Sequence, residues 1–265
     1  MNFLKFILLL LAIALLCFSV FIAISTFGNP MTLIAVNGAA EDYLGEKYPG
    51  REFTVEPAAY DFKLSNYCVN VSDPELVDCH FSLYYDSEGV FHSDTYRDRY
   101  LSGFNTAARI DNAYRSLTKG VFESEAFNHN VSIAYGLVEF SDRDDEGNSV
   151  PYSSLTLDGD FTTKEFGMAA GAIVVYIVTE DVSAEAMART LLDIRAVFDA
   201  AEVPFKTIDL TLTEEELRAD RGTTVVSFLY TDIREDGLMD RVSAAIEEAR
   251  IYDESVDEEM MPEEG

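Results

Sequence analysis

The chain has 265 residues, enough for one large domain or two small ones, and its 48% of hydrophobic residues is ample for a packed core. Its net charge is −29, because 48 acidic residues outnumber 19 basic ones. Such a charge repels phosphate backbones, so nucleic acid is not an expected partner; the charge is compatible with cations or basic partner surfaces, and its simplest effect is solubility.

The N-terminal segment, residues 6-27, carries no charge and consists mainly of Leu, Ile, Ala and Phe. As a helix it would be roughly 33 Å long, enough to cross a hydrocarbon core of about 30 Å. We therefore predict a transmembrane helix that contacts the lipid bilayer through residues 6-27. A cleavable signal peptide is the alternative, but its apolar region usually has about 7–15 residues, and Ser25-Thr26-Phe27 is a poor cleavage site. An uncleaved signal anchor is the favoured interpretation.

The charges on either side of this segment predict its orientation. Lys5 precedes it, and the first charge after it is Glu41. Positive residues are retained on the cytoplasmic side of a membrane span. The expected localisation is the cell membrane, with a single span, a cytoplasmic N-terminus and an extracytoplasmic body.

The first part of the body, residues 31-127, has the pattern of a helix, antiparallel strands and a second helix. Its expected elements, in chain order, are a helix over 32–48, strands over 51–57, 60–71 and 77–86, and a long helix over 94–123. Apolar residues repeat in the long helix at spacings of three and four. They are Tyr100, Phe104, Ala107, Ile110, Tyr114, Leu117 and Val121.

Two cysteines, Cys68 and Cys79, lie outside the apolar span; Cys17 lies within it as a small apolar residue. They flank Ser72-Asp73-Pro74-Glu75, which has the composition of a turn. A hairpin around this loop would bring the thiols close, and an oxidising compartment would favour a bridge. Cys68 and Cys79 are therefore a candidate disulfide, with two free buried thiols as the alternative.

The second part of the body, residues 128-252, alternates strands with helices. Strands are expected over 131–140, 152–157, 172–178, 205–212 and 223–233, and helices over 183–201 and 238–252. Ser183 caps the first of these helices, and Thr213 and Glu216 have the spacing of a capping box. This order suits a two-layer sandwich that resembles a ferredoxin-like half with extra strands.

The predicted fold class is α+β: an N-terminal transmembrane helix followed by two small two-layer α/β sandwich domains with mainly antiparallel sheets. The expected parts are residues 1-30 for the cytoplasmic N-terminus and anchor, 31-127 for the first domain, 128-252 for the ferredoxin-like domain, and 253-265 for an acidic disordered tail.

Several short motifs within residues 40–96 resemble a known family. They are Ala40-Glu41-Asp42-Tyr43-Leu44-Gly45-Glu46-Lys47-Tyr48-Pro49-Gly50, Phe53-Thr54-Val55, Asp61-Phe62-Lys63, Tyr67 and His80-Phe81. They resemble the YfjL-like proteins of Gram-positive bacteria, which are anchored by one N-terminal helix. The first helix, its Tyr-Pro-Gly stop and the following strand also resemble PepSY-type domains. The first resemblance implies an envelope location without a particular activity, and the second implies protein binding or inhibition, as an analogy of fold.

The sequence Ser116-Leu117-Thr118-Lys119 matches the S-x-x-K motif of penicillin-binding proteins, whose serine begins a helix and has companion S-D-N and K-T-G motifs. Here Ser116 is expected near a helix end, and both companion motifs are absent from the sequence. The spacing of Gly167 and Gly171 matches G-x-x-x-G outside any apolar 20-residue segment, so close packing before the strand that begins at Ala172 explains it.

The segment from Asp142 to Gly147 resembles the beginning of a calcium loop, but the twelfth position, where such loops have a bidentate Glu, is Ser153. A solvated turn is the better interpretation. The three histidines, His80, His92 and His129, are too few and too scattered for a metal site. We therefore predict no catalytic residue, no cofactor and no metal ligand.

The leading hypothesis is a non-enzymatic, membrane-tethered module that binds an envelope protein or peptide, in an oligomeric state that the sequence leaves open. An envelope-acting hydrolase with carboxylate general acid/base residues is the alternative, and a cation-responsive sensor using the loop from Asp142 to Glu146 is a third. A cleft with two facing carboxylates would favour the enzyme. An exposed apolar patch would favour binding.

Overall fold

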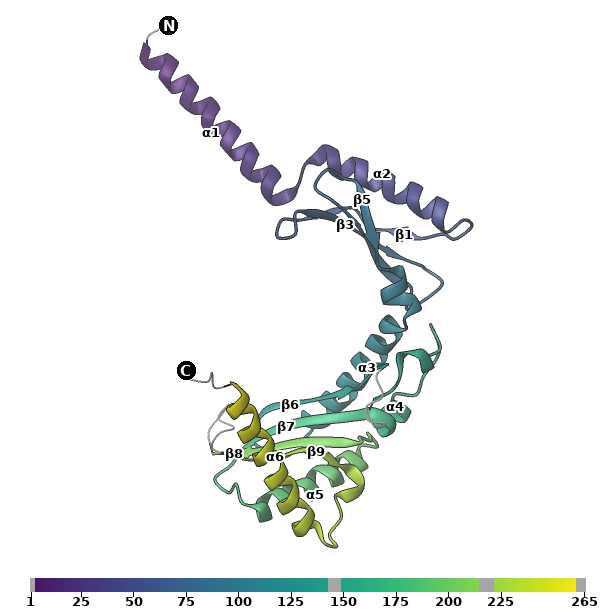
Figure 1. Cartoon of the computed structure of the whole chain (residues 1–265), viewed down its shortest axis with the longest axis vertical. Helices are drawn as coiled ribbons and strands as arrows, with labels where there is room; N and C mark the ends of the chain where they lie inside the picture. The colour runs from purple at the N-terminus through teal and green to yellow at the C-terminus, as the bar shows by residue number, and fades with distance from the viewer. Residues whose placement is uncertain (1–2, 143–148, 215–221, 261–265) are drawn as a thin grey trace. The chain divides into compact units, whose positions relative to one another are not determined.

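The computed structural model describes residues 3–142, 149–214 and 222–260, with side chains described between 7 and 252 (Figure 1). The chain is a mixed α/β protein with one long N-terminal apolar helix and two sheets of mostly antiparallel strands, which confirms the predicted fold class. It divides into two compact units. The first contains residues 1–106 and 156–158, and the second contains 107–155 and 159–265.

Helix α1 (Phe3–Phe27) is long and apolar enough to cross a membrane, and its described side chains are exposed. The next residue, Gly28, has a φ of +80°, and a β-carbon there would lie 2.8 Å from Tyr60 Cβ. Glycine is therefore required where α1 ends.

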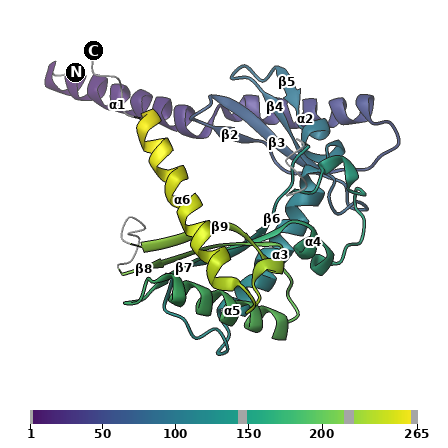
Figure 2. The same cartoon turned by 60° about the horizontal axis from the view of Figure 1, so that its bottom comes forward.

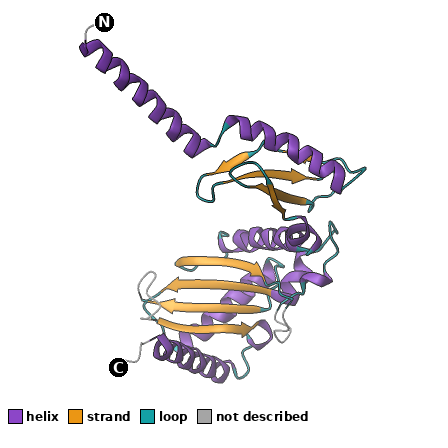
Figure 3. Cartoon of the chain, turned by 45° about the horizontal axis from the view of Figure 1, so that its top comes forward, coloured by secondary structure: helices purple, strands orange, loops and turns teal. Residues whose placement is uncertain are grey.

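Helix α2 (Pro30–Lys47) begins with two strong start signals. The side-chain oxygen of Asn29 accepts a hydrogen bond from the backbone N–H of Met31 at 2.9 Å, and Pro30 occupies the first turn. The helix lies along one face of the first sheet (Figure 3) and buries Val36, Ala40 and Leu44 against it.

The first sheet is antiparallel throughout. Its strands are β1 (Thr54–Val55), β2 (Ala59–Asp61), β3 (Asn66–Ser72), β4 (His80–Tyr85) and β5 (Phe91–Asp94). They lie in the order β1-β3-β4-β5. β2 also pairs with β3, and Figure 2 shows these two strands side by side. The core between this sheet and α2 consists of Val36, Ala40, Leu44, Tyr67, Val69, Val71, Cys79, Phe81, Leu83, Tyr85 and Tyr100.

The expected disulfide is not formed in the structure, because Cys68 and Cys79 lie on opposite faces of the sheet. The hairpin of β3 and β4 exists, but its register places Cys68 opposite Tyr84. Cys79 is fully buried in the core, whereas Cys68 is half-buried on the outer face, where its thiol donates to Asn70 Oδ1 at 3.8 Å. Both thiols are free.

We expect thiol labelling to reproduce this arrangement. Burial raises the pKa of both thiols, and thiol reagents react with the thiolate. In the folded protein Cys68 should react slowly and Cys79 should be protected, whereas the denatured protein should take up one label at each, with or without prior reduction. Mass spectrometry measures the number of labels. Two fewer labels in the unreduced than in the reduced denatured protein would reveal a bridge.

The long helix expected over 94–123 is interrupted. Asp94 ends β5, a π-helical turn covers Tyr96–Leu101, and α3 extends over Phe104–Phe122. Gly103, with a φ of +81°, separates the two helical segments.

The apolar stripe of this region is shared by two cores. Tyr100 packs in the first core, whereas Ile110, Tyr114 and Val121 pack in the second. The boundary between the units therefore falls inside α3, and not at residue 127 as the sequence suggested.

Strand β5 is held to α2 by a polar cluster. Lys47 Nζ lies 2.5 Å from Asp94 Oδ2, and the hydroxyl of Tyr43 donates to the same oxygen. Burial alone would raise the pKa of Asp94, but the hydrogen bonds from Lys47 and Tyr43 outweigh it and lower that pKa. The ionised carboxylate is thus the form that the fold stabilises.

Acid should therefore weaken the first unit, and Asp94→Asn should reduce this effect. Because the pKa of Asp94 is lowered by folding, its contribution to the free energy of unfolding is present above the unfolded-state pKa of about 3.9. It is lost as the pH falls through the lower folded-state pKa. Unfolding curves measured between neutral pH and acid should show a shallower fall for Asp94→Asn than for Glu46→Gln, which removes an exposed carboxylate from α2. Equal slopes would contradict the prediction.

The second sheet mixes both kinds of pairing. Its strands, in spatial order, are β6 (Val131–Val138), β7 (Gly171–Val178), β8 (Thr207–Thr213) and β9 (Gly222–Leu229). The outer pairs are antiparallel. β7 and β8 are parallel, because helix α5 (Ala184–Ala200) connects them. Ser183 caps α5 as predicted, with its hydroxyl accepting from the backbone N–H of Ala186.

Two further helices complete this unit: α4 (Thr163–Ala170), which the sequence did not predict, and α6 (Leu238–Met260). α6 contacts α5 and β9. Its backbone continues to Met260, so the tail expected from Asp253 begins as helix, and residues 261–265 lie outside the described part.

The strand expected over 152–157 is wrong. A 3-10 turn covers Tyr152–Ser154, where Pro151 offers no backbone N–H and the hydroxyl of Ser154 donates to the carbonyl of Pro151 at 2.7 Å. Leu157 packs instead against the core of the first unit. Glu216, the second residue of the expected capping box, lies outside the described residues.

Candidate functional site

Ser116 is directed toward its own helix. It is exposed on α3, and its hydroxyl donates to the carbonyl of Asn112 at 3.0 Å. Lys119 lies 3.7 Å from Glu123. The serine of the S-x-x-K sequence therefore makes a hydrogen bond within its own helix, and the lysine makes a solvent-exposed ion pair.

The residues considered for metal binding are spread over both units. His80 is in β4, His92 in β5, and His129 precedes β6. Among the described side chains (residues 7–142, 149–214 and 222–252), no three His, Cys, Asp or Glu are grouped to hold a metal ion. Asp142 accepts a hydrogen bond from the backbone N–H of Ser153 at 3.2 Å, while residues 143–148 of the suggested loop lie outside the described part.

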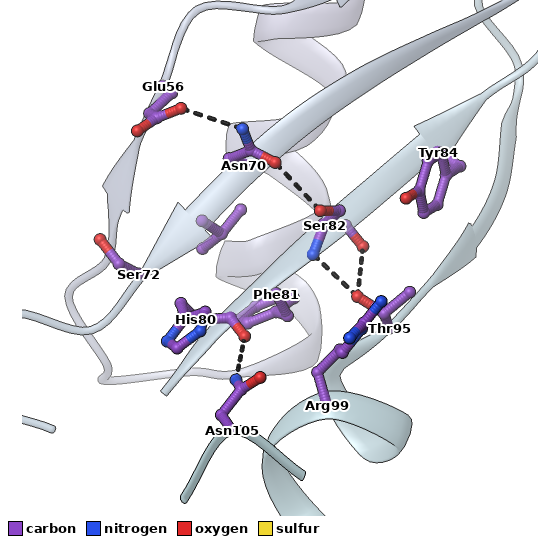
Figure 4. A pocket seen from close by; sticks show the side chains of 11 residues that line it. Glu56, Asn70, Ser72, His80, Phe81, Ser82, Tyr84, Thr95, Arg99 and Asn105 are labelled. Atoms are coloured by element: carbon purple, nitrogen blue, oxygen red, sulfur yellow. Dashed lines mark hydrogen bonds between the residues drawn. The ribbon is translucent and has the colours of Figure 1, made fainter. Parts of the chain in front are cut away.

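The outer face of the first sheet forms a polar pocket of about 380 Å³ (Figure 4). Its polar lining comes from β3, β4 and the segments that flank the sheet. The polar residues are Glu56, Asn70, Ser72, His80, Ser82, Tyr84, Thr95, Arg99 and Asn105.

A chain of hydrogen bonds crosses this pocket (Figure 4). Asn70 Nδ2 donates to Glu56 Oε2 at 3.0 Å, and the hydroxyl of Ser82 donates to Asn70 Oδ1 at 3.0 Å. The backbone N–H of Ser82 donates to Thr95 Oγ1 at 2.9 Å. An amide oxygen does not act as a general base, so this contact does not activate Ser82 as a nucleophile.

The charged side chains of this polar pocket do not form a cluster. Glu56 is the one carboxylate among its described lining residues, while Arg99 stacks 4.5 Å from the ring centroid of Phe104. The pair of facing carboxylates expected of a hydrolase is not formed by these lining residues. The arrangement can accept and donate hydrogen bonds to a polar ligand.

A second hollow, in the second unit, is apolar. This apolar groove has a volume of about 720 Å³ and lies where the ends of α4, α5, β8 and β9 meet. Its lining consists of Lys164, Met168, Phe198, Asp199, Glu202, Val203, Pro204, Phe205, Lys206, Leu229, Tyr230 and Thr231. Ligand sites are commonly such concave, mainly apolar surfaces with a few polar groups at the edge.

The floor of the apolar groove consists of buried aromatic rings, and the side chains at its edge are exposed. Phe198 and Phe205 are buried and pack edge to face at 5.4 Å, whereas Met168 is 69% exposed and Leu229 is 40% exposed. An exposed methionine is unbranched and adapts its shape to an incoming apolar group.

Charged groups lie around this floor. Lys164 lies 2.8 Å from Glu202, which joins α4 to the residues after α5. The hydroxyl of Tyr230 donates to Asp199 Oδ1 at 2.8 Å, and the guanidinium carbon of Arg195 lies 4.4 Å from the Tyr230 ring centroid. Burial raises the pKa of Tyr230, and its bond to Asp199 adds to the effect.

Sequence reasoning did not find either hollow. The apolar groove draws on residues 164–168, 198–206 and 229–231, three segments whose spacing follows no motif. The one local signal was Met168, an apolar residue between the two glycines of Gly167-x-x-x-Gly171.

Comparison with family models gives two matches. The model described as the YfjL-like N-terminal domain matches residues 3–93, and that of the YfjL-like C-terminal domain matches residues 114–243. Searches of curated proteins and of solved structures gave no match.

Proposed function

The chain belongs to the YfjL-like family, and we propose that it is a membrane-tethered module that binds a protein or peptide outside the cytoplasm. The apolar groove of the second unit is the binding site in this proposal, and the observation that carries it is the exposed Met168 and Leu229 over a buried aromatic floor. Interface energy usually concentrates in a few such apolar anchors.

The tether is helix α1, and two features support it. Its apolar side chains are exposed in the folded chain, which is the arrangement expected of a helix surrounded by lipid. Lys5 lies before the apolar segment and the next charge is Glu41, which favours a cytoplasmic N-terminus.

The acidic composition suits such a module. A net charge of −29 would steer basic partner surfaces toward the chain and would make their association slower at high salt. The occupant of the groove itself would be an apolar side chain of the partner, because Met168, Leu229 and Phe205 offer it no charge.

The proposal is tested with a photo-crosslinking amino acid placed at Met168 or at Ile251, which is 54% exposed on α6. In native membranes, Met168 should give a defined protein or peptide adduct and Ile251 should not. Leu229→Glu should reduce the adduct about tenfold or more, because a charge in an apolar contact costs at least as much as a hot-spot truncation. Protease added to spheroplasts should digest the body.

Three outcomes would overturn the proposal. Equal adduct yields from Met168 and Ile251 would remove the apolar groove as the binding site. Protection of the body from external protease would reverse the orientation. Turnover of envelope material that is lost on Glu56→Gln would replace binding with catalysis in the polar pocket.

A further inference from the structure

The turn between β2 and β3 presents large apolar side chains to the surroundings. Phe62 is 58% exposed and Leu64 is 68% exposed, with Lys63 between them. A contiguous group of exposed apolar residues usually marks a contact surface.

This turn is held in one conformation. Asp61 Oδ1 accepts hydrogen bonds from the backbone N–H of Lys63 at 2.8 Å and of Leu64 at 3.2 Å. Ser65 then adopts a φ of +52°, which closes the turn onto Asn66, the strand partner of Asp61. The hydrogen-bonded turn therefore keeps the side chains of Phe62 and Leu64 exposed.

The base of the same hairpin is attached to the end of α1. Tyr60 and Tyr67 pair across it with ring centroids 4.9 Å apart. A β-carbon at Gly28 would lie 2.9 Å from a ring atom of each tyrosine, and the hydroxyl of Tyr67 accepts the backbone N–H of Asn29 at 2.9 Å. α1 and β2 are in direct contact, as Figure 2 shows. The turn begins two residues beyond Tyr60, which places it about 7 Å farther along the strand.

Further apolar side chains are exposed where α1 ends and α2 begins. Phe27 is 73% exposed, and on the first turns of α2 Met31 is 73% and Ile34 is 68% exposed. Residues 28–40 carry no charge. The exposed apolar side chains of the helix junction and of the β2–β3 turn thus lie next to the end of the apolar span.

We propose that the turn Phe62–Ser65, together with Met31 and Ile34, is a second membrane contact that enters the headgroup region of the bilayer crossed by α1. It rests on the proposed function, because the bilayer must end near Phe27. Apolar side chains flanked by a basic residue favour this interfacial region. The ammonium of Lys63 meets lipid phosphates there, while Oδ1 of Asp61 accepts the two backbone hydrogen bonds of the turn. Two points of attachment would hold the first unit against the bilayer surface.

The test uses the absence of tryptophan from the sequence. Each variant of the full chain carries one Trp and is reconstituted in phosphatidylcholine–phosphatidylglycerol vesicles: Leu64→Trp, Phe18→Trp within α1, or Val77→Trp. Val77 is 64% exposed and follows the opposite end of β3, so it is the matched control. Lipids brominated near the headgroup end should quench Leu64→Trp at least about twofold more than Val77→Trp, because interfacial groups lie about 5–10 Å into the boundary. Lipids brominated deep in the acyl chains should quench Phe18→Trp, which lies near the middle of the apolar span.

The three positions separate the two proposals. Quenching of Phe18→Trp and Leu64→Trp, with Val77→Trp accessible to aqueous iodide, supports both the tether and the second contact. Quenching of Phe18→Trp alone keeps the tether and overturns the second contact. Quenching of neither overturns both. Protection of Leu64→Trp from iodide without lipid quenching means that a protein surface covers the turn, which also overturns the second contact. Asp61→Ala should lessen the quenching of Leu64→Trp, since it frees the turn.

Discussion

Replacing Tyr114 with alanine should destabilise the second unit by about 3–5 kcal/mol, the usual cost of removing a large aromatic ring from a packed core. The Tyr114 side chain is fully buried, and its hydroxyl donates to the carbonyl of Pro204 at 3.0 Å. A β-carbon at Gly167 or Gly171 would lie 2.8 Å or less from this side chain. The ring therefore occupies the space that these two glycines leave, and few atoms could move in to fill the cavity.

Thermal unfolding of the full chain in detergent, followed by circular dichroism, measures this effect. The loss is a large part of the roughly 5–15 kcal/mol that stabilises a typical domain. Tyr114→Phe keeps the ring and should cost only about 0.5–1.5 kcal/mol, the usual net value of one hydrogen bond. Tyr135→Ala removes a tyrosine that is 40% exposed on β6 and is the control. A Tyr114→Ala variant as stable as Tyr135→Ala would contradict this account of the glycine spacing.

The elements that the sequence predicted correctly are those whose apolar pattern is complete within one segment. α5 buries Met187, Leu191, Ile194 and Phe198, which recur at helical spacing, and it has a serine cap. β7 is a continuous apolar run. The interpretation of Gly167 and Gly171 as packing residues is also confirmed, because Tyr114 supplies the neighbour.

The elements that were missed depend on partners distant in sequence. β5 is a four-residue edge strand, with Phe91 and His92 exposed, so it shows no alternation. The stripe from Tyr100 to Val121 looked like one helix because period alone does not reveal that its two ends enter different cores. The disulfide expectation failed for a related reason: spacing gave the hairpin, but only the register decides which face each cysteine occupies.

The sequence also did not predict that residues 156–158 pack in the first unit. Asp158 sits there with a φ of +56°, in the left-handed region. Its Oδ1 accepts the backbone N–H of Asp78 at 2.6 Å, and its Oδ2 accepts the hydroxyl of Tyr100 at 2.7 Å. Burial and this hydrogen bond both raise the pKa of Tyr100, so the phenol stays protonated and keeps donating.

The position of Asp158 matters because its partners are buried. Asp78 is 1% exposed and Tyr100 is 8% exposed. Asn105 donates to the carbonyl of Asp78 at 2.8 Å, and the hydroxyl of Thr106 donates to its carboxylate at 2.7 Å. One carboxylate therefore satisfies a donor from each of two buried residues, and it completes a network that holds the start of β4.

Asp158→Ala should destabilise the first unit by about 2–4 kcal/mol, because it leaves two buried donors without acceptors and puts alanine in a left-handed conformation. Asp158→Asn keeps an acceptor and tolerates that conformation, so it should cost about 1 kcal/mol or less. Asp158→Gly removes the carboxylate, but glycine adopts a left-handed conformation without strain. Its loss of stability should therefore lie between those of the Asn and Ala variants. Hydrogen exchange of the β3 and β4 amides measures the loss, with the β7 amides as the internal control. If the Asn and Ala variants lose equal protection, the hydrogen bonds of Asp158 are not what holds this segment in place.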